Sequence, residues 1–246
     1  MNLLNRLIVF FISALVLLFS ACKKENRCDC IKRTGDIISE VRTVKAFDRL
    51  QVEQNVNVFI TEDPTFEVKV EAGENIVPLI QTVVEDGTLI IRNKNKCNWA
   101  RAYNKPLNVY IKTPSLAYIS MNGTGTIKSL NTLTQDTLDI TIENSGNVDL
   151  TVNSLKVVSH MFGYGDLTLH GHTNENACSI GGTAFLNCKD LTTSYTWVQS
   201  FTLGTCYVTA SDLLICRFDD KGDIYCYGHP TTVQQTNNGS GQLHIE

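Results

Sequence analysis

A short pattern centred on glycine recurs in the second half of the chain. Its seven copies begin at Gly125, Gly146, Gly165, Gly182, Gly204, Gly222 and Gly241. Successive glycines are 21, 19, 17, 22, 18 and 19 residues apart, and a segment of strand type follows each of them. A period of about 20 residues with one strand per repeat is typical of a β-solenoid, in which each repeat forms one rung of a stack. The repeat therefore predicts an all-β chain.

The residues that follow each glycine alternate in polarity. Those two and four places after the glycine are apolar in thirteen of fourteen cases, whereas a chain that is 43% hydrophobic gives about six by chance. Those one and three places after it are polar in eleven of fourteen cases. Because side chains alternate faces along a strand, the first set is predicted to point inward and to stack into a core. Burial of one Leu, Ile or Val stabilises the fold by about 1.5–3 kcal/mol.

The glycines themselves are predicted to lie at the corners of the rungs. A rung must bend sharply there, and glycine reaches a positive φ without steric cost. The pairs Asn122-Gly123 and Ser145-Gly146 are typical of such turns. We therefore expect a positive φ at the repeated glycines.

The first residues resemble a bacterial lipoprotein signal. Arg6 precedes an apolar run from Leu7 to Leu18, which is shorter than the roughly 20 residues that a transmembrane helix needs. The ending Ser20-Ala21-Cys22 resembles a lipobox, so residues 1–21 are predicted to be cleaved and Cys22 to be lipidated. The alternative is a plain secretory signal. Residues 22–40 would then form a short tether to the membrane, and we expect an outer-membrane lipoprotein on the periplasmic side or at the cell surface.

The remaining chain, residues 41–246, is expected to form one domain. Its first part, residues 41–112, has a looser strand pattern than the regular rungs of residues 113–246. A short helical turn is expected at Asn75–Thr82. The candidate strands of the first part are Leu50–Val58, Phe66–Glu71, Thr88–Arg92 and Leu107–Lys112.

The order of these segments resembles that of a known family. The strand Asp86-Gly-Thr-Leu-Ile-Ile and the turn Asn122-Gly-Thr-Gly-Thr-Ile carry the likeness most closely. Over about residues 43–230 the chain resembles the putative auto-transporter adhesin head GIN domain family of Gram-negative bacteria. The resemblance implies a single-stranded right-handed β-helix, often carried on a lipoprotein. An adhesive function is a weaker implication, because the name adhesin is an inference from the shape of the family's members. The resemblance itself involves no catalytic motif.

Nine cysteines raise the question of disulfides. With Cys22 lipidated, eight remain in an oxidising compartment. Near the N-terminus we predict a disulfide between Cys30 and Cys97, which would tie the tether to the first sheet. Zinc is not expected, because Cys28 and Cys30 are separated by one residue and no second pair follows. No metal and no cofactor are predicted.

Five further cysteines lie among the rungs, and two interpretations of them stay open. They are Cys178, Cys188, Cys206, Cys216 and Cys226. Most fall on inward positions, where free thiols pack as small hydrophobic groups. Alternatively, neighbouring rungs are about 4.8 Å apart, close to the Cα separation that a disulfide needs, so bridges between rungs are also possible.

No catalytic constellation emerges from the sequence. None of the five histidines lies in a known nucleophile or metal spacing. Asp219 and Asp220 are adjacent, so on a strand their side chains would point to opposite faces. Catalysis by paired carboxylates requires both groups to face the same substrate bond. We interpret them as turn residues and predict that the chain is not an enzyme.

One outward position is aromatic in the last four repeats. The residues three places after the glycine are Phe185, Tyr207, Tyr225 and His244. If the rungs stack in register, they form a stripe. It is interpreted either as a binding platform for sugar rings or a protein partner, or as a stabilising ladder of cross-strand pairs.

Three classes of function remain. The first is a membrane-anchored, non-catalytic binding or adhesion module for a glycan or an envelope protein. The second is a structural envelope protein without a small ligand, whose last rung, at Gly241, has no obvious cap. The third, a carbohydrate-active enzyme, is the least favoured. A formal net charge of −4 with no basic patch argues against nucleic acid as a partner, and the oligomeric state is not predicted.

Overall fold

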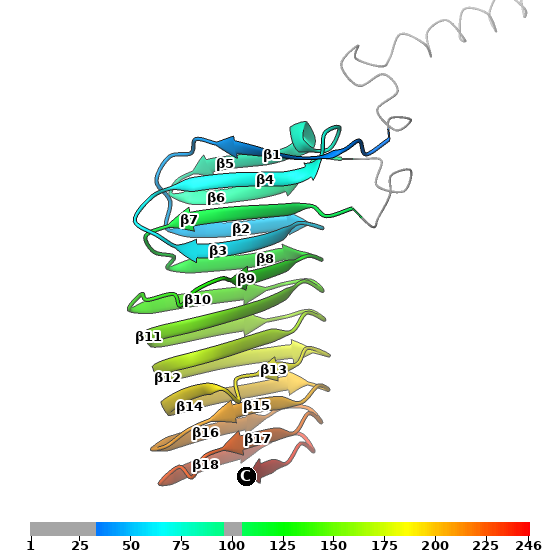
Figure 1. The fold of residues 1–246 in the computed structure, drawn as a ribbon. Coiled ribbons are helices and arrows are strands. Elements are labelled where there is room, and N and C mark those ends of the chain that lie inside the picture. The colour runs from blue at the N-terminus through cyan, green and yellow to red at the C-terminus, as the bar shows by residue number, and fades with distance from the viewer. Residues whose placement is uncertain (1–32, 96–104) are drawn as a thin grey trace, which may run out of the picture.

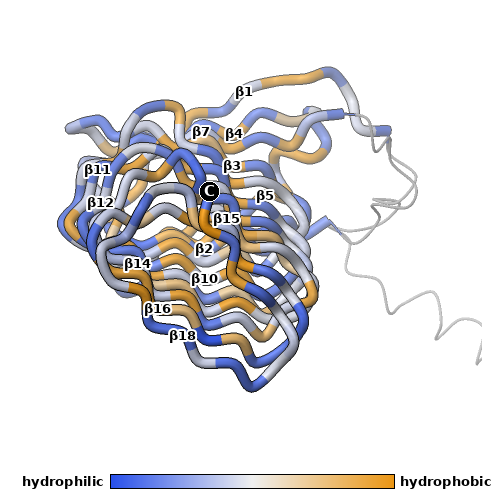
Figure 2. Tube along the Cα trace, turned by 90° about the horizontal axis from the view of Figure 1, so that it is seen from below, coloured by the Kyte–Doolittle hydropathy of each residue, from blue (hydrophilic) through white to orange (hydrophobic). Residues whose placement is uncertain are grey.

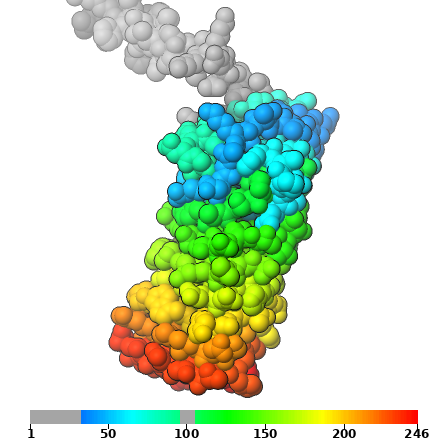
Figure 3. All heavy atoms as spheres, turned by 90° about the vertical axis from the view of Figure 1, so that its left-hand side faces the viewer, coloured from blue at the N-terminus to red at the C-terminus, as the bar shows by residue number. Residues whose placement is uncertain are grey.

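The computed structural model describes residues 33–95 and 105–246, and 62% of these residues lie in β-strands, which form one stack. Figure 1 shows the strands lying across a common axis, from β1 at one end to β18 near the C-terminus at the other. In Figure 3 the colours from green to red follow the chain in order along the column, whereas the blue and cyan segments of the first strands lie intermixed at the opposite end. The predicted β-solenoid is confirmed, with about 7 turns spaced by about 19 residues.

The strands of the first half are between four and seven residues long. A 3-10 turn, η3, spans Val77–Leu79. The strands are β1 Ile37–Arg42, β2 Arg49–Gln54, β3 Asn57–Glu62, β4 Glu67–Gly73, β5 Ile80–Glu85, β6 Thr88–Asn93, β7 Asn108–Thr113, β8 Tyr118–Gly123 and β9 Thr126–Ser129.

The second half contains strands of very different length, from 2 to 16 residues. They are β10 Thr137–Ile142, β11 Asn147–Met161, β12 Leu167–Gly182, β13 Leu186–Asn187, β14 Leu191–Thr202, β15 Cys206–Thr209, β16 Leu213–Phe218, β17 Ile224–Tyr227, β18 Thr232–Asn237 and β19 Leu243–Ile245.

Parallel pairing between successive rungs builds the solenoid. One run of pairs joins β10, β11, β12, β14, β16 and β18, and another joins β13, β15, β17 and β19. The register places like residues opposite each other, for example Leu150 opposite Leu169. Figure 2 looks at this stack from its C-terminal end and shows the rungs one behind another.

The N-terminal strands make the first rung and cover it. β2 and β3 pair in parallel with β8 and β9 of the next rung. β4 lies antiparallel between β1 and β7, and β5 is antiparallel to β6. The expected strand Leu50–Val58 is interrupted, because Gln54 has a φ of 57° and turns the chain between β2 and β3. The helical turn expected at Asn75–Thr82 is reduced to η3, and β5 takes over from Ile80.

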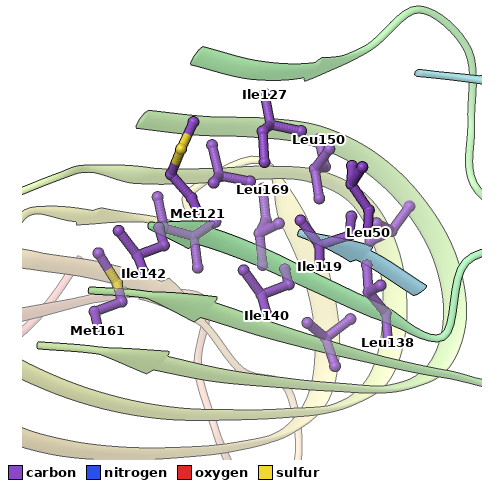
Figure 4. Packing of buried hydrophobic residues seen from close by; sticks show 14 of the residues in the cluster. Leu50, Ile119, Met121, Ile127, Leu138, Ile140, Ile142, Leu150, Met161 and Leu169 are labelled. Atoms are coloured by element: carbon purple, nitrogen blue, oxygen red, sulfur yellow. The ribbon is translucent and has the colours of Figure 1, made fainter. Parts of the chain in front are cut away.

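The core consists of the inward column predicted from the repeat. Twelve of the fourteen residues two and four places after the glycines are buried, and the two exceptions, Leu243 and Ile245, belong to the last rung. Figure 4 shows buried side chains from neighbouring strands in contact, such as Ile119 beside Ile140, whose strands pair in that register. This continuous apolar column holds the rungs together.

The repeated glycines are required for a reason other than the one predicted. Of the seven, only Gly182 has a positive φ, so that expectation was wrong for the other six. At those corners the backbones of successive rungs approach too closely for a side chain. A Cβ added to Gly125 would lie 1.9 Å from the carbonyl oxygen of Val56, and one added to Gly165 would lie 2.0 Å from that of Gly146. The glycines therefore let the rungs stack at the corner.

The last rung covers the end of the core in part. Gln235 and Asn237 occupy the places opposite Cys216 and Phe218, and the amide of Gln235 donates a hydrogen bond of 2.8 Å to Oδ1 of Asn237. Polar side chains thus replace the apolar column on one side, as terminal repeats require for solubility. On the other side Ile245 is 48% exposed.

Candidate functional site

Three of the four predicted stripe residues stack on one another. Tyr207, Tyr225 and His244 lie on β15, β17 and β19 and pair in register. The ring centroids of Tyr207 and Tyr225 are 5.5 Å apart, and those of Tyr225 and His244 are 4.4 Å apart with an interplanar angle of 13°. All three side chains are half-buried. They form a ladder of rings on the outer face of the short strands.

Phe185 is not part of this ladder, which corrects the predicted stripe. Asn187 stands opposite Tyr207, and Phe185 lies two residues earlier, where its N–H donates to Oδ1 of Asp166 at 3.2 Å. The corner position of this rung belongs to Ala184, whose carbonyl oxygen faces Gly204. Counting from Gly182 therefore shifted the register by two residues. The shift preserves the alternation, so the inward and outward assignments still hold.

A groove beside the ladder nevertheless brings Phe185 close to it. The groove has a volume of about 480 Å³. It is lined by Asp166, Thr168, Phe185, Asn187, Lys189, Tyr207 and Tyr227. Phe185 and Tyr207 thus line one concave surface, although they belong to different columns.

Tyr227 and Lys189 were not predicted as site residues. The Nζ atom of Lys189 lies 4.1 Å from the centroid of the Tyr227 ring, a cation–π contact that orders both side chains at the groove. Tyr227 follows Tyr225 by two residues, so the alternation of the strand could have placed it on the same face. The sequence did not single out Lys189, because its contact with Tyr227 arises only when the rungs stack.

The five cysteines of the rungs are free thiols, so the first of the two interpretations is confirmed. Cys178, Cys188, Cys206, Cys216 and Cys226 are all buried, and none is joined to another residue in the described part of the chain. The thiol of Cys178 lies 3.2 Å from Oδ1 of Asn176 and donates to it. Burial raises the pKa of Cys206, and it raises that of Cys216 to about 12. Cys22, Cys28, Cys30 and Cys97 lie outside the described residues, so the predicted lipidation and the predicted Cys30–Cys97 disulfide stay predictions.

The raised pKa of Cys216 predicts a loss of stability in alkali. An unfolded cysteine releases its proton near pH ~8.5, whereas folded Cys216 keeps it up to about pH 12. Unfolding therefore releases a proton above pH ~8.5, so the stability that is complete below this pH is lost progressively as the pH rises towards 12. We expect the midpoint of thermal unfolding, measured under reducing conditions, to fall between pH 8 and pH 10. The fall should be smaller in Cys216→Ala, which removes the titrating group, and an equal fall in both proteins would contradict the assignment.

Two histidines lie beside carboxylates on the surface. His244 lies 3.4 Å from Asp223, and His170 lies between Asp149 and Asp190 at 3.4 and 3.6 Å. No group of three or more His, Cys, Asp or Glu side chains suited to a metal occurs among the described residues.

Asp219 and Asp220 lie in a turn after β16, as predicted. The carboxylate of Asp219 accepts hydrogen bonds from Asn238 at 2.6 Å and Gln199 at 3.0 Å, and it pairs with Arg217. The hydrogen bond from Asn238 is the largest of the causes that lower the pKa of Asp219. This carboxylate is engaged in holding neighbouring rungs together.

No helix in the described ranges is long and apolar enough to cross a membrane.

Comparisons with known proteins agree with this architecture. The chain is similar to the crystal structure of a putative adhesin from Bacteroides fragilis, with 25% identity, a TM-score of 0.81, and coverage of 87% of this chain and 100% of that one. A putative adhesin from Parabacteroides distasonis gives 21% identity and a TM-score of 0.61, with the same coverage. A putative lipid binding protein from Parabacteroides distasonis gives 18% identity and a TM-score of 0.64, also with the same coverage. At these lower identities the likeness shows the fold alone. A search of curated proteins found no match.

A family model covers most of the solenoid. The model described as putative auto-transporter adhesin, head GIN domain, matches residues 46–230, from the start of the first rung to the loop after β17. The match includes Phe185, Tyr207 and Tyr225 but ends before His244. The chain belongs to the putative auto-transporter adhesin, head GIN domain, family.

Proposed function

We propose that this protein is a non-catalytic binding module of the cell envelope that captures a glycan through the aromatic groove on its C-terminal rungs. The observation that carries the proposal is the ladder of Tyr207, Tyr225 and His244 beside a groove of about 480 Å³. Membership of an adhesin-like family supports the general class of function. The lipobox-like ending at Cys22 supports attachment to the outer membrane through lipid.

The chemistry of the groove suits a sugar. Pyranose rings have apolar C–H faces that pack on aromatic rings, and their hydroxyls need both donors and acceptors. Tyr207, Tyr227 and Phe185 supply the rings, while Asn187 and Thr168 supply polar groups in the same groove. A rigid stack of parallel strands holds these side chains in fixed positions, which reduces the entropy lost on binding.

Removal of two rings tests the proposal. The double variant Tyr207→Ser, Tyr225→Ser should abolish binding to glycan arrays and to glycan-bearing cells, because it removes one ring that lines the groove and the neighbouring ring that packs on it. Circular dichroism should stay that of the folded protein. The matched control is Tyr164→Ser, Tyr195→Ser, which removes two tyrosines that are 72% and 48% exposed and lie outside the groove. If the rings serve only as a stabilising ladder, the first variant will melt earlier but bind as before, and the proposal is wrong.

The side of the membrane decides which glycans can be reached. Protease shaving of intact cells, with the outer membrane verified as sealed, separates the two placements. Cleavage places the solenoid at the cell surface, where adhesion to other cells is possible. Protection places it in the periplasm, where its partners are envelope components found by crosslinking.

A structural role in the envelope is the second candidate. Val233 and Ile245 on the last rung are 40% and 48% exposed, and the outer edge of β18 and β19 has no paired strand in the described chain. Such an edge can pair with another chain. Concentration-dependent association in sedimentation experiments, lost in Val233→Lys, would favour this role over glycan capture.

A further inference from the structure

A second concave surface lies at the corner where β11 and β12 bend. It has a volume of about 310 Å³, at the lower end of the roughly 300–1,000 Å³ found for ligand pockets. It is lined by Thr134, Gln135, Asp136, Asn153, Ser154, Leu155, His172 and Asn174. None of these residues lines the aromatic groove.

Three successive rungs build this corner pocket. Leu133 stands opposite Val152 and Thr137 opposite Lys156, so the intervening residues continue the same register. Asn153 in turn stands opposite His172. The polar residues of the pocket are therefore spread over residues 134–136, 153–155 and 172–174 but are stacked at one place in the fold.

The outward polar groups of the pocket have no partner in the protein. Over the described residues, the side chains of Asp136, Asn153, His172 and Asn174 make no hydrogen bond or ion pair. All four are exposed. Asn131, by contrast, is engaged with the backbone of Glu62. Four unengaged polar side chains around one concave surface are available for a ligand.

The lining residues Gln135 and Ser154 carry buried polar atoms without partners. Both amide atoms of Gln135 and the hydroxyl of Ser154 are buried without a hydrogen bond. In the following two rungs the same column is satisfied, because Thr173 donates to the carbonyl of Glu175 and Thr193 donates to that of Thr209. The hydrogen-bonding deficit of this column thus lies in the first two of the three rungs that form the pocket. Buried polar groups without partners require an explanation.

We propose that the corner pocket binds one neutral sugar residue. Asn153 and Asn174 can each donate to and accept from hydroxyls, and the Asp136 carboxylate can accept from two vicinal hydroxyls. Leu155, which is 56% exposed, offers an apolar contact for the C–H face of the ring. No Lys or Arg lines the pocket, so an acidic ligand is disfavoured.

The corner pocket extends the proposed glycan site, and this link between pocket and groove rests on the proposed function. Thr168 of the groove and His172 of the pocket lie four residues apart on β12, at most about 13 Å along the strand. A single oligosaccharide can therefore contact both. The groove would hold rings by stacking, and the pocket would select one sugar by its hydroxyls.

Nuclear magnetic resonance of the labelled full chain tests the inference. D-glucose, D-galactose, D-mannose and L-fucose are titrated separately at millimolar concentrations, and the side-chain amide signals of Asn153 and Asn174 are followed. At least one sugar should shift both signals, and Asn153→Ala should weaken its binding at least tenfold. The matched control is Thr192→Ala, since Thr192 follows His172 in the same outward column but lies outside the pocket.

The outcomes separate this inference from the proposed function. If none of the four sugars shifts the two amide signals, or if Asn153→Ala and Thr192→Ala bind alike, the pocket assignment is overturned. Binding of longer glycans can still depend on Tyr207 and Tyr225 in that case, so the proposed function stands or falls separately. Shifts at Asn153 and Asn174 that persist in Tyr207→Ser, Tyr225→Ser support the pocket as a sugar site in its own right.

Discussion

Gly165→Ala is expected to destabilise the solenoid by about 3 kcal/mol, because it adds an atom where two rungs are in contact. The new Cβ would lie 2.0 Å from the carbonyl oxygen of Gly146 and 3.1 Å from Cγ2 of Ile142. A backbone oxygen cannot move aside as a flexible side chain can. The rungs must therefore separate, which weakens the 3.0 Å hydrogen bond from the N–H of Gly165 to the carbonyl of Asn144. Urea denaturation followed by far-UV circular dichroism measures the effect as a lower midpoint.

Gly181→Ala is the matched control for this prediction. A Cβ on Gly181 would have its nearest neighbours at 3.6 Å, the carbonyl oxygen of Met161, and at 3.9 Å, an atom of the Phe162 ring. Gly181 also lies within β12 and has no positive φ itself. Alanine there lowers the conformational entropy of the unfolded chain, which favours the folded state. We expect a change of ~0.5 kcal/mol or less. Equal midpoints for the two variants would show that the close approach at the corner does not require glycine.

Phe218→Ala is expected to cost about 3–5 kcal/mol, the range for deletion of a buried phenylalanine ring. Phe218 is fully buried at the end of β16, and its ring also lies against the corner at Gly241, where an added Cβ would be 2.8 Å from Cδ1 of Phe218. The cavity would open directly beneath the last rung, which has few other apolar contacts. We expect amide hydrogen exchange of β18 and β19 to become faster than that of β11 and β12, in addition to a lower midpoint of unfolding.

Phe162→Ala provides the comparison for Phe218→Ala. It removes the same ring from a side chain that is 62% exposed, so little apolar burial is lost. We expect a loss of less than ~1 kcal/mol and no change in exchange at β18 and β19. If Phe218→Ala is as mild as this, the last rung does not depend on the core beneath it, and Gln235 and Asn237 cap the solenoid by themselves.

The aromatic site shows how far sequence reasoning could reach. Tyr207, Tyr225 and His244 were found because each lies three residues after a glycine that occupies the corner of its rung. Phe185 was misplaced because Ala184, and not Gly182, occupies the corner of its rung. A glycine count cannot detect a corner that carries an alanine.

The residues of the corner pocket gave no signal in the sequence. Asn153 and Asn174 belong to different repeats and to no motif, and they become neighbours of Asp136 only through the stacking of rungs. The same is true of Lys189 in the groove. Contacts between rungs join residues about 20 positions apart. Which residues meet depends on the register between rungs, and a shift of two residues keeps the same alternation of inward and outward side chains, so local patterns do not exclude it.

The sequence by itself determined the solenoid, its period and its inward column, because burial of alternating apolar residues leaves one arrangement in which every repeat covers its neighbour. The tertiary structure alone decided which outward side chains meet and why the corners need glycine. Both depend on the close approach of backbones in successive rungs: a Cβ at Gly165 would lie 2.0 Å from the rung before it. This contact joins residues that lie in separate repeats, and no local segment of the chain encodes it.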